Sequence, residues 1–337
     1  MSDETGAPIE DEAARKLRLE QEIEQYRDDD GVHDLPPVHH YWSERYVKPK
    51  LQSCGFGDEF EFYLKYILRT CAAAGDEPVN IVSLGSGNGD LELVLAAKGR
   101  QLGVRNFVFH CLELNPHMIE RARRDVEDSG LGQRFTFEEV DLATWTPSRR
   151  YDICIAHHCL HHMRELDDLF AAIKNGLWPD GLLLTNDMIG RNGHMRWPEA
   201  LSLVEELWRE LPRRCKFNQQ LMRFEDDYVN FDCAAVGSEG IRSQDILPLL
   251  MEHFHFEVFV GFANLADVFV GRAFGPNFDL SRPEDLAFVD RVARMDDEKI
   301  DGGEIKPTHM AAVLRPTAVA EIAVYRGWTP EHCVRRP

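Results

Sequence analysis

A glycine-rich turn, Gly85-Ser86-Gly87-Asn88-Gly89, follows directly on the apolar and β-branched run 79–84. The segment after the turn, 91–98, has the apolar spacing of a helix, so the sequence predicts a strand, a sharp turn and a helix in succession. Glycines at such a turn let the backbone approach a ligand, and the first amides of the helix face that ligand. The Lys-Ser or Lys-Thr pair of a phosphate-cradling NTPase loop does not follow. A tight connection and a nucleoside site are therefore the two interpretations to weigh.

The alternation of strands and helices continues beyond the turn. Further strands are expected at 106–114, 135–140, 151–156 and 182–186, and further helices at 117–129 and 166–177. Two later strand candidates, 254–261 and 267–273, would extend the sheet. Alternation at this spacing predicts an α/β fold with a mostly parallel sheet covered by helices on both faces.

Acidic side chains end the second and third predicted strands. Glu113 lies 24 residues past Gly89, where a carboxylate can accept hydrogen bonds from both hydroxyls of a ribose. Asp141 follows the third strand, within reach of an adenine amino group. Each acid alone is an ordinary strand-end residue, but the carboxyl ends of parallel strands meet at one crevice, where ligands bind in open α/β sheets. The turn and the two acids together indicate a nucleoside cofactor site.

These segments resemble the class I S-adenosylmethionine-dependent methyltransferases of the small-molecule type. The motifs that carry the resemblance are LGSGNG, LELNPHMIERA, EVDLATW, YDICIAHHCLHHM and LWPDGLLLTND. The resemblance rests on these motifs over residues 79–190, and only on the pattern of the sequence over residues 245–275. It implies S-adenosyl-L-methionine as cofactor and a Rossmann-like fold with a mostly parallel seven-stranded sheet and helices on both faces. The resemblance leaves the first 75 residues and the tail uncovered, and this chain is expected to add an N-terminal helical arm and an insert after strand five to that fold.

The resemblance also implies the cofactor-binding residues, which are Gly85, Ser86, Gly87, Gly89, Glu113, Leu114, Asp141, Leu142, Ala156 and His157. In that family the glycines line the methionine and ribose, the strand-two acid holds the ribose hydroxyls, and the strand-three motif meets the adenine. One position departs from the pattern. Ser83 stands where the family often has an acid, so Asp90 or the N-terminal segment would bind the amino group of the cofactor instead.

Four histidines follow the fourth predicted strand, at positions 157, 158, 161 and 162. Their i, i+4 spacing would allow metal chelation on a helix, but a His-His pair is common at this place in the family. We therefore expect packing or cofactor contacts first, a general base second, and no metal ligands. Methyl transfer to a hydroxyl needs a group that accepts the proton. The candidates are His157, His161 and Asp187, with His194 in the loop beyond.

Composition divides the rest of the chain. Residues 1–30 carry eleven acids and four bases and are expected to form an acidic flexible arm. The aromatic and histidine-rich segment 31–75 is expected to be an N-terminal helical lid or cap. The Rossmann-like domain would span 76–275, with a substrate-side insert at 191–245, and 276–337 would be a C-terminal extension.

Charge and hydropathy limit the classes of partner. The net charge of −20 disfavours nucleic acid, and no apolar window is long enough to predict a membrane span. Eight scattered cysteines without a CxxC motif, and an acidic start without a secretory signal, indicate a cytoplasmic protein. The composition does not predict an oligomeric state.

The sequence thus predicts a methyltransferase that acts on a small or medium-sized acceptor, with O-methylation favoured. Two alternatives remain open at this point. One is a nicotinamide-dependent Rossmann oxidoreductase, since a glycine turn and a strand-two acid also fit that class. The other is a non-catalytic module that binds S-adenosylmethionine.

Overall fold

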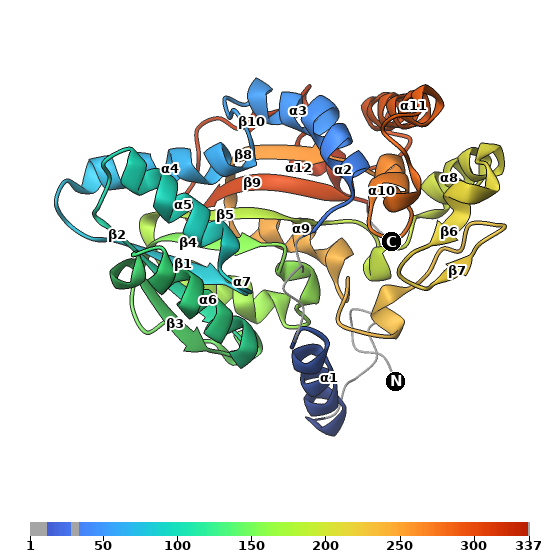
Figure 1. Ribbon diagram of the computed structural model, residues 1–337. Coiled ribbons are helices and arrows are strands. Elements are labelled where there is room, and N and C mark those ends of the chain that lie inside the picture. Colours follow the sequence, from blue (N-terminus) through green and yellow to red (C-terminus); the bar gives the residue numbers. More distant parts are fainter. Residues whose placement is uncertain (1–11, 28–33, 336–337) are drawn as a thin grey trace.

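The computed structural model describes residues 12–27 and 34–335. Its centre is an eight-stranded sheet in the order β10-β8-β9-β5-β4-β1-β2-β3 (Figure 1). The first five strands run parallel to one another and are β1 (Val79–Leu84), β2 (Phe107–Glu113), β3 (Phe135–Glu139), β4 (Tyr151–His157) and β5 (Leu177–Met188). β9 (His309–Arg315) runs antiparallel to β5 and to β8 (His255–Phe262), and β10 (Ala323–Val324) forms the short edge. The predicted α/β Rossmann-like class is confirmed, with one edge strand more than the seven expected.

The register of the central strands brings the predicted site residues to one edge. β1 lies between β2 and β4, with Leu84 opposite Leu112 on one side and Ala156 on the other. All residues of β1 except Asn80 are buried, as expected for a strand covered on both faces. The chain therefore leaves β1, β2 and β4 at neighbouring points, and the glycine turn, Glu113 and His157 follow there.

Helices cover both faces of the sheet (Figure 1). α4 (Glu59–Ala74) and α5 (Asp90–Gln101) pack together on one face, near α6 (Pro116–Asp128). α7 (Leu166–Gly176) and α9 (Ser243–His253) pack together on the other. The insert after β5 contains α8 (Pro198–Glu210) and a hairpin of β6 (Phe217–Asn218) and β7 (Arg223–Phe224). None of the described helices combines the length and the apolar character that crossing a bilayer requires.

The structure corrects the expected end of the domain. Residues 267–273, predicted as a strand, fall in a short helix, α10 (Leu265–Val270), and the turn after it. The carboxylate of Asp296 in α11 (Pro283–Asp301) accepts hydrogen bonds from the backbone N–H groups of 264, 265 and 266, which fixes this helical start despite the strand-like Val and Phe content. In place of the strand predicted at 267–273, the sheet contains β9. The segment expected as a C-terminal extension therefore inserts a strand between β5 and β8.

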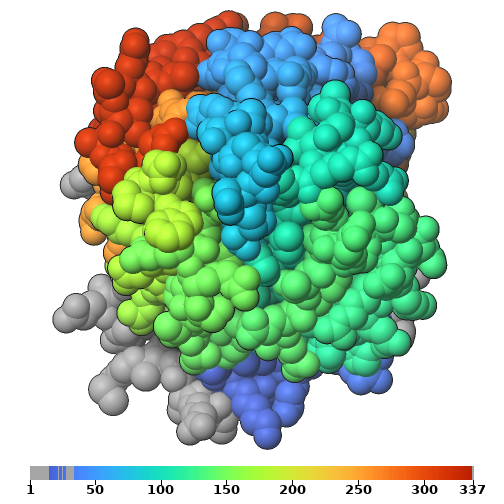
Figure 2. Space-filling model, turned by 90° about the vertical axis from the view of Figure 1, so that its left-hand side faces the viewer, coloured from blue at the N-terminus to red at the C-terminus, as the bar shows by residue number. Residues whose placement is uncertain are grey.

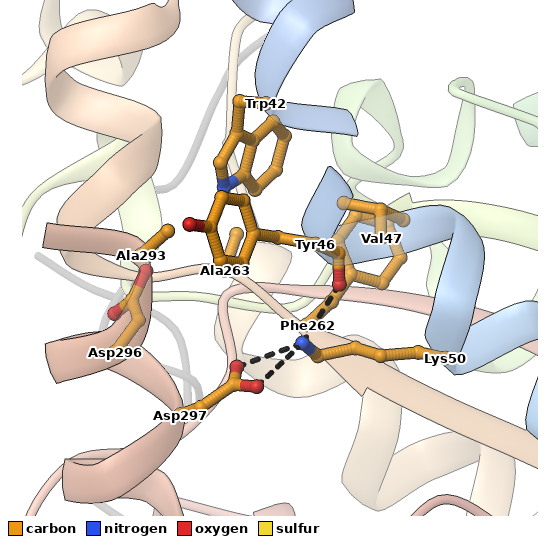
Figure 3. Close-up of a pocket in the computed structure, with 9 residues that line it drawn as sticks. All are labelled: Trp42, Tyr46, Val47, Lys50, Phe262, Ala263, Ala293, Asp296 and Asp297. Carbon is orange, nitrogen blue, oxygen red and sulfur yellow. Dashed lines mark hydrogen bonds and ion pairs between the residues drawn. The ribbon is translucent and has the colours of Figure 1, made fainter. Parts of the chain in front are cut away.

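The N-terminal helices before α4 pack against the C-terminal half of the chain. α2 (Pro37–Trp42), a π-helical turn (Ser43–Val47) and α3 (Lys48–Ser53) lie beside α11. Figure 3 shows a small cavity there and the buried pair of Lys50 and Asp297, whose nitrogen and oxygen atoms are 2.7 Å apart. The hydroxyls of Tyr41 and Tyr46 both donate to Asp290 of α11. On one face of the molecule, the blue N-terminal helices adjoin the red C-terminal segment, which ends in α12 (Pro330–Cys333) (Figure 2).

Candidate functional site

The glycine turn after β1 has the backbone conformation that its composition predicts. The φ angles of Gly85, Gly87 and Gly89 are 57°, 56° and 73°, a region that residues with side chains rarely occupy. A Cβ atom on Gly85 would lie 2.8 Å from the Cβ atom of Cys159. The N–H of Ser86 donates to the carbonyl of Leu112, so the turn folds toward the end of β2. Gly85 is therefore required for two reasons, because its φ is positive and because a Cβ atom would contact Cys159 too closely.

Glu113 ends β2 directly beside this turn. Its carboxylate accepts hydrogen bonds from the backbone N–H of Gly87 at 2.8 Å and of Asn115 at 2.9 Å. These contacts fix the orientation of a carboxylate that is only 9% exposed. Leu114 follows at the same edge and is partly exposed. The structure therefore places the carboxylate of Glu113, the predicted ribose-binding residue, directly beside the glycine turn.

Asp141, Leu142 and Ala156 complete the row of residues at this edge. One carboxylate oxygen of Asp141 accepts the N–H of Ala143, and the other is paired with Arg15. Leu142 and Ala156 are buried. The structure thus brings the predicted cofactor residues of β1, β2, β3 and β4 to one edge of the sheet.

A buried carboxyl group of α5 lies beside Ser83, the position where the family pattern has an acid. The hydroxyl of Ser83 donates to Glu92, and burial raises the pKa of Glu92 to about 7. Asp90 and the N-terminal segment were the residues expected to replace the missing acid, and Glu92 was not among them. The helical spacing of Glu92 with Leu95 and Ala96, at i, i+3 and i+4, is the signal that predicts its burial.

Helix α1 (Glu12–Gln25) lies across the same edge. Besides the pairing of Arg15 with Asp141, the side chain of Asn115 donates to the carbonyl of Ile23 at 3.1 Å. Arg121 of α6 donates to the carbonyl of Tyr26 at 3.0 Å. Within the segment expected to be a flexible arm, residues 12–27 are therefore in contact with the crevice, while 1–11 and 28–30 lie outside the described residues. The predicted lid residues 37–53 instead pack on α11.

A histidine–carboxylate pair lies at the carboxyl ends of β4 and β5. The Nδ1 atom of His161 is 2.6 Å from a carboxylate oxygen of Asp187, and both side chains are buried. Asp187 also accepts the backbone N–H groups of Cys159 and Leu160. Since these bonds fix the carboxylate, it sets the ring orientation of His161 and leaves Nε2 facing the other way.

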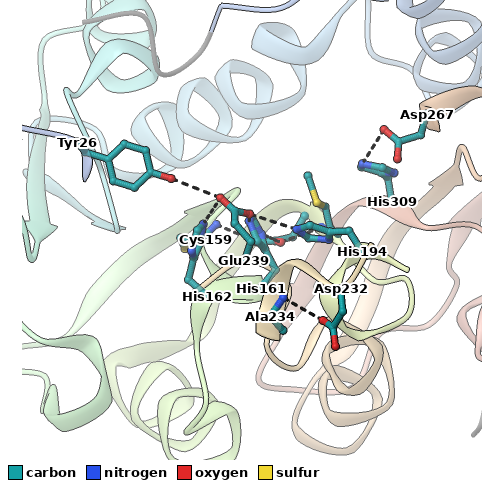
Figure 4. Close-up of polar contacts among 12 residues, drawn as sticks. Tyr26, Cys159, His161, His162, His194, Asp232, Ala234, Glu239, Asp267 and His309 are labelled. Carbon is teal, nitrogen blue, oxygen red and sulfur yellow. Dashed lines mark hydrogen bonds and ion pairs between the residues drawn. The ribbon is translucent and has the colours of Figure 1, made fainter. Parts of the chain in front are cut away.

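Glu239, from the insert, faces the Nε2 atom of His161 (Figure 4). One oxygen of Glu239 lies 3.4 Å from Nε2 of His161 and 3.2 Å from Nε2 of His194. The hydroxyl of Tyr26 donates to the other oxygen at 3.4 Å. The sequence offered His194 as a further candidate base and did not count Glu239 among the catalytic candidates, and the structure brings both side chains to His161.

His157 takes a different position from His161. Residues 160–162 form a 3-10 turn, so the two rings do not share the face of an α-helix that chelation at i, i+4 would need. The Nδ1 atom of His157 lies 2.9 Å from the hydroxyl of Tyr63 and 4.0 Å from Glu59. Of the three predicted catalytic residues, His161 and Asp187 therefore meet and His157 lies apart with α4.

The protonation states of the His161 group follow from its neighbours. Burial disfavours the cation, but the carboxylates of Asp187 and Glu239 outweigh burial and raise the pKa of His161 to about 10. Burial alone would raise the pKa of Glu239, but the hydrogen bonds from His161 and His194 hold it well below its usual range. Burial and the charge of His161 lower the pKa of His162 to about 4. At neutral pH the group is an imidazolium between two carboxylates.

Two sets of side chains offer three donor atoms within metal-binding distance of one another. Within the described residues they are His161 with His194 and Glu239, and Glu59 with His157 and His158, the atoms of each set lying within 4.8 Å of one another. In the first set, the imidazolium of His161 already balances the charge of Glu239. The donor geometry alone therefore does not assign a metal.

A glycine turn, strand-end acids and a mostly parallel sheet define a Rossmann-like domain of the class I methyltransferase type. Residues 81–181 match the family described as "Methyltransferase domain". They form a class I S-adenosylmethionine-dependent methyltransferase domain, as the sequence motifs predicted.

Similarity to individual proteins extends over parts of the chain. It is 27% identical over 107 residues to the trans-aconitate 2-methyltransferase of Streptomyces avermitilis, a match that spans 32% of this chain and 38% of that relative's own length. A candidate sarcosine dimethylglycine methyltransferase of Galdieria sulphuraria has a similar structure, with a TM-score of 0.44, 15% identity and coverage of 76% of this chain and 85% of that one. An O-methyltransferase of a polyketide synthase multienzyme of Brevibacillus brevis, in complex with S-adenosyl-L-homocysteine, gives a TM-score of 0.40, 13% identity and coverage of 74% and 70%.

Proposed function

We propose that this protein is an O-methyltransferase that transfers the methyl group of S-adenosylmethionine to a hydroxyl of a small or medium-sized acceptor. The observation that carries the proposal is the buried pair of His161 and Asp187 at the same sheet edge as the glycine turn and Glu113. That edge is where a cofactor and an acceptor would meet in an open α/β sheet.

The residues at the edge fit this cofactor. Glu113, fixed by two backbone N–H groups, would accept hydrogen bonds from the ribose hydroxyls. Asp141 and Leu142 would contact the adenine, and the left-handed glycines leave room for the methionine portion. When bound, S-adenosylmethionine supplies an electrophilic methyl group on its sulfonium. Methyl transfer then needs from the protein the alignment of the acceptor and a place for its proton.

His161 is the proposed proton acceptor. Nε2 of His161 would take the proton of the acceptor hydroxyl, and only the neutral form of the ring can do so. Its raised pKa leaves the ring mostly protonated at neutral pH. Asp187 holds Nδ1–H and stabilises the resulting imidazolium, so its role is that of a positioning residue. Glu239 and His194 would orient the acceptor hydroxyl, and His157, which the sequence also named, would flank the sulfonium end of the cofactor.

We propose that the cluster acts without a metal. The positive charge beside Glu239 is supplied by His161, and Asp187 supplies the matching negative charge on the other side. Elemental analysis of the dialysed protein should find no stoichiometric transition metal, and a chelator should leave methyl transfer unchanged. A metal that is lost together with activity would contradict this assignment.

Transfer of labelled methyl groups from S-adenosylmethionine to a panel of alcohols and phenols tests the proposed function. The wild type should label a hydroxyl, and His161→Gln should lose at least about 100-fold in kcat while it retains affinity for S-adenosylhomocysteine. Binding of NADH in place of S-adenosylhomocysteine would favour the oxidoreductase, and binding of S-adenosylmethionine without transfer would favour the non-catalytic module. A cytoplasmic location and the absence of a nucleic-acid partner stay predictions.

A further inference from the structure

A small cavity adjoins the His161 group on the side of His194. It has a volume of about 10 Å³, room for one hydroxyl-sized group, and polar side chains of Arg196, Asp267, Thr308 and His309 line it together with His194. Figure 4 shows Asp267 and His309 in the same view as His161, His194 and Glu239. Because His194 lines it, the cavity lies next to the proposed reaction site.

Arg196, which lines this cavity, has a buried donor that lacks an acceptor in the described part of the chain. The guanidinium is buried, with Nη2 bonded to Asp267 and Nη1 donating to the carbonyl of His194 at 2.9 Å. Its Nε–H group has no hydrogen-bond partner among the described residues. Because an unsatisfied buried donor is costly, this N–H favours an oxygen from a bound molecule.

Asp267 places a negative charge at the same cavity. Although burial opposes ionisation, the charge and the hydrogen bond of Arg196 hold the pKa of Asp267 below its usual range, so the carboxylate is ionised at neutral pH. His309 stacks on Phe262, and its Nε2 atom lies 4.0 Å from an oxygen of Asp267. Burial lowers the pKa of His309, so the ring is neutral. The cavity thus combines a donor from Arg196 with an ionised acceptor.

This combination discriminates among ligand groups. A carboxylate or phosphate would accept from Arg196 but would be repelled by Asp267, and an ammonium would pair with Asp267 but would be repelled by Arg196. A hydroxyl satisfies both sides, since it accepts from the arginine and donates to the carboxylate. The chemistry of the lining therefore favours a neutral hydroxyl group.

We propose that the acceptor is polyhydroxylated, like a sugar, and that a second hydroxyl binds between Arg196 and Asp267 while the reacting hydroxyl lies at His161. The inference rests on the proposed function. His194 connects the two positions, since its ring contacts Glu239 and its carbonyl accepts from Arg196. Its φ of 55° is rare for a residue with a side chain and holds it between them. An acceptor that carries both hydroxyls would therefore meet His194 at each of them.

Methyl pyranosides of glucose, galactose and mannose, with their singly deoxygenated analogues, are suitable probes. We expect at least one pyranoside to bind to the complex with S-adenosylhomocysteine and to be methylated in the presence of S-adenosylmethionine. Loss of the second hydroxyl should lower kcat/KM at least about 100-fold, because a buried polar site then has no partner. A monohydric alcohol has no second hydroxyl, so its kcat/KM should not depend on the cavity in this way.

Two variants and a control assign the effect to the cavity. Asp267→Asn should abolish the preference for the pyranoside over its deoxy analogue. Because this change leaves a buried arginine without its partner charge, His309→Phe serves as a second variant that keeps the stacking on Phe262. It should lower kcat/KM for the pyranoside at least tenfold and leave affinity for S-adenosylhomocysteine unchanged. His253→Phe, at the end of α9 beside Phe170, is the matched control and should change neither.

Several outcomes would overturn the inference. They are the failure of every pyranoside to bind, equal rates for pyranoside and deoxy analogues, and methylation of a tricarboxylate such as trans-aconitate in preference to a pyranoside. Failure of S-adenosylhomocysteine to bind would contradict the proposed function instead. Pyranoside binding measured by calorimetry on the protein without cofactor would then still decide whether the hydroxyl site exists.

Discussion

The Nδ1 atom of His161 and a carboxylate oxygen of Asp187 are 2.6 Å apart, and the two side chains are 4% and 0% exposed. This contact joins the loop after β4 to the end of β5. Asp187 is already bonded to the N–H groups of Cys159 and Leu160, so the pair has one orientation and presents Nε2 of His161 toward Glu239. A fixed imidazole with a raised proton affinity is the feature on which the proposed chemistry depends.

The rate of methyl transfer should therefore rise with pH. The base is the neutral imidazole, and a pKa of His161 raised to about 10 means that its neutral fraction increases up to that pH. Asp187→Asn should shift the apparent pKa of this rise down toward the ordinary histidine value, and should lower the kcat reached on the high-pH plateau by about 10²-fold or more. The pH dependence of kcat measures both effects. Asp168→Asn, on the exposed side of α7, should behave as the wild type, and an unshifted profile in Asp187→Asn would contradict the role of the pair.

Glu113→Ala should weaken the binding of S-adenosylhomocysteine by about 1–3 kcal/mol, because the ribose hydroxyls lose a charged acceptor. Isothermal titration calorimetry measures the change. Glu139→Ala provides the control, since Glu139 ends the neighbouring strand β3 but is exposed. Equal affinity of wild type and Glu113→Ala would remove the ribose assignment.

Helix α1 should slow the release of bound cofactor. Arg15 is paired with Asp141 at the predicted adenine position, so Arg15→Ala should loosen α1 and speed the dissociation of S-adenosylhomocysteine several-fold, and should make α1 more sensitive to protease. Lys16→Ala alters an exposed residue of the same helix and should leave both unchanged. Identical dissociation rates and protease patterns in the two variants would show that α1 does not cover the cofactor.

Glu92 should make the protein less stable as pH rises. Burial raises its pKa from 4.5 to about 7 in the folded state. The free energy of unfolding is therefore highest below pH 4.5, where the carboxyl group is protonated in both states, and falls as the pH approaches 7. The loss corresponds to about 3 kcal/mol. Glu92→Gln, which is neutral at every pH, should lack this dependence in urea unfolding between pH 4.5 and 7. The exposed Glu120→Gln should retain it, and a wild-type slope in Glu92→Gln would contradict the assignment.

The cofactor edge could be predicted from the sequence because its residues follow strands. Gly85, Glu113 and Asp141 each stand directly after an apolar run, and parallel strands end at a common edge. The order of the strands is therefore enough to predict that these residues lie close together, and side-chain packing need not be known. The position of β9 could not be predicted in this way, because an antiparallel strand that arrives after a long helix carries no βα spacing.

The acceptor side depends on contacts that the local pattern does not contain. His161 comes from the loop after β4, and His194 and Glu239 come from distant parts of the insert. Neither segment has periodic apolar spacing, so their approach follows from tertiary packing. The strand expected over 267–273 failed for the same reason, since Asp296 from a distant helix stabilises the amide groups at the start of α10. The position of α1 over Asp141 likewise depends on long-range contacts, the ion pair of Arg15 with Asp141 and the hydrogen bonds from Asn115 and Arg121 to backbone carbonyls of residues 23 and 26.

Calorimetric titration of the purified protein with S-adenosylhomocysteine and, separately, with NADH tests the central claim most directly. The structure predicts one S-adenosylhomocysteine site per chain, no binding of NADH, and loss of the site in Gly87→Val, whose side chain does not fit a φ of 56°. Circular dichroism of that variant should match the wild type. Binding of NADH in place of S-adenosylhomocysteine, or wild-type affinity in Gly87→Val, would contradict the assignment of this crevice to a methyltransferase.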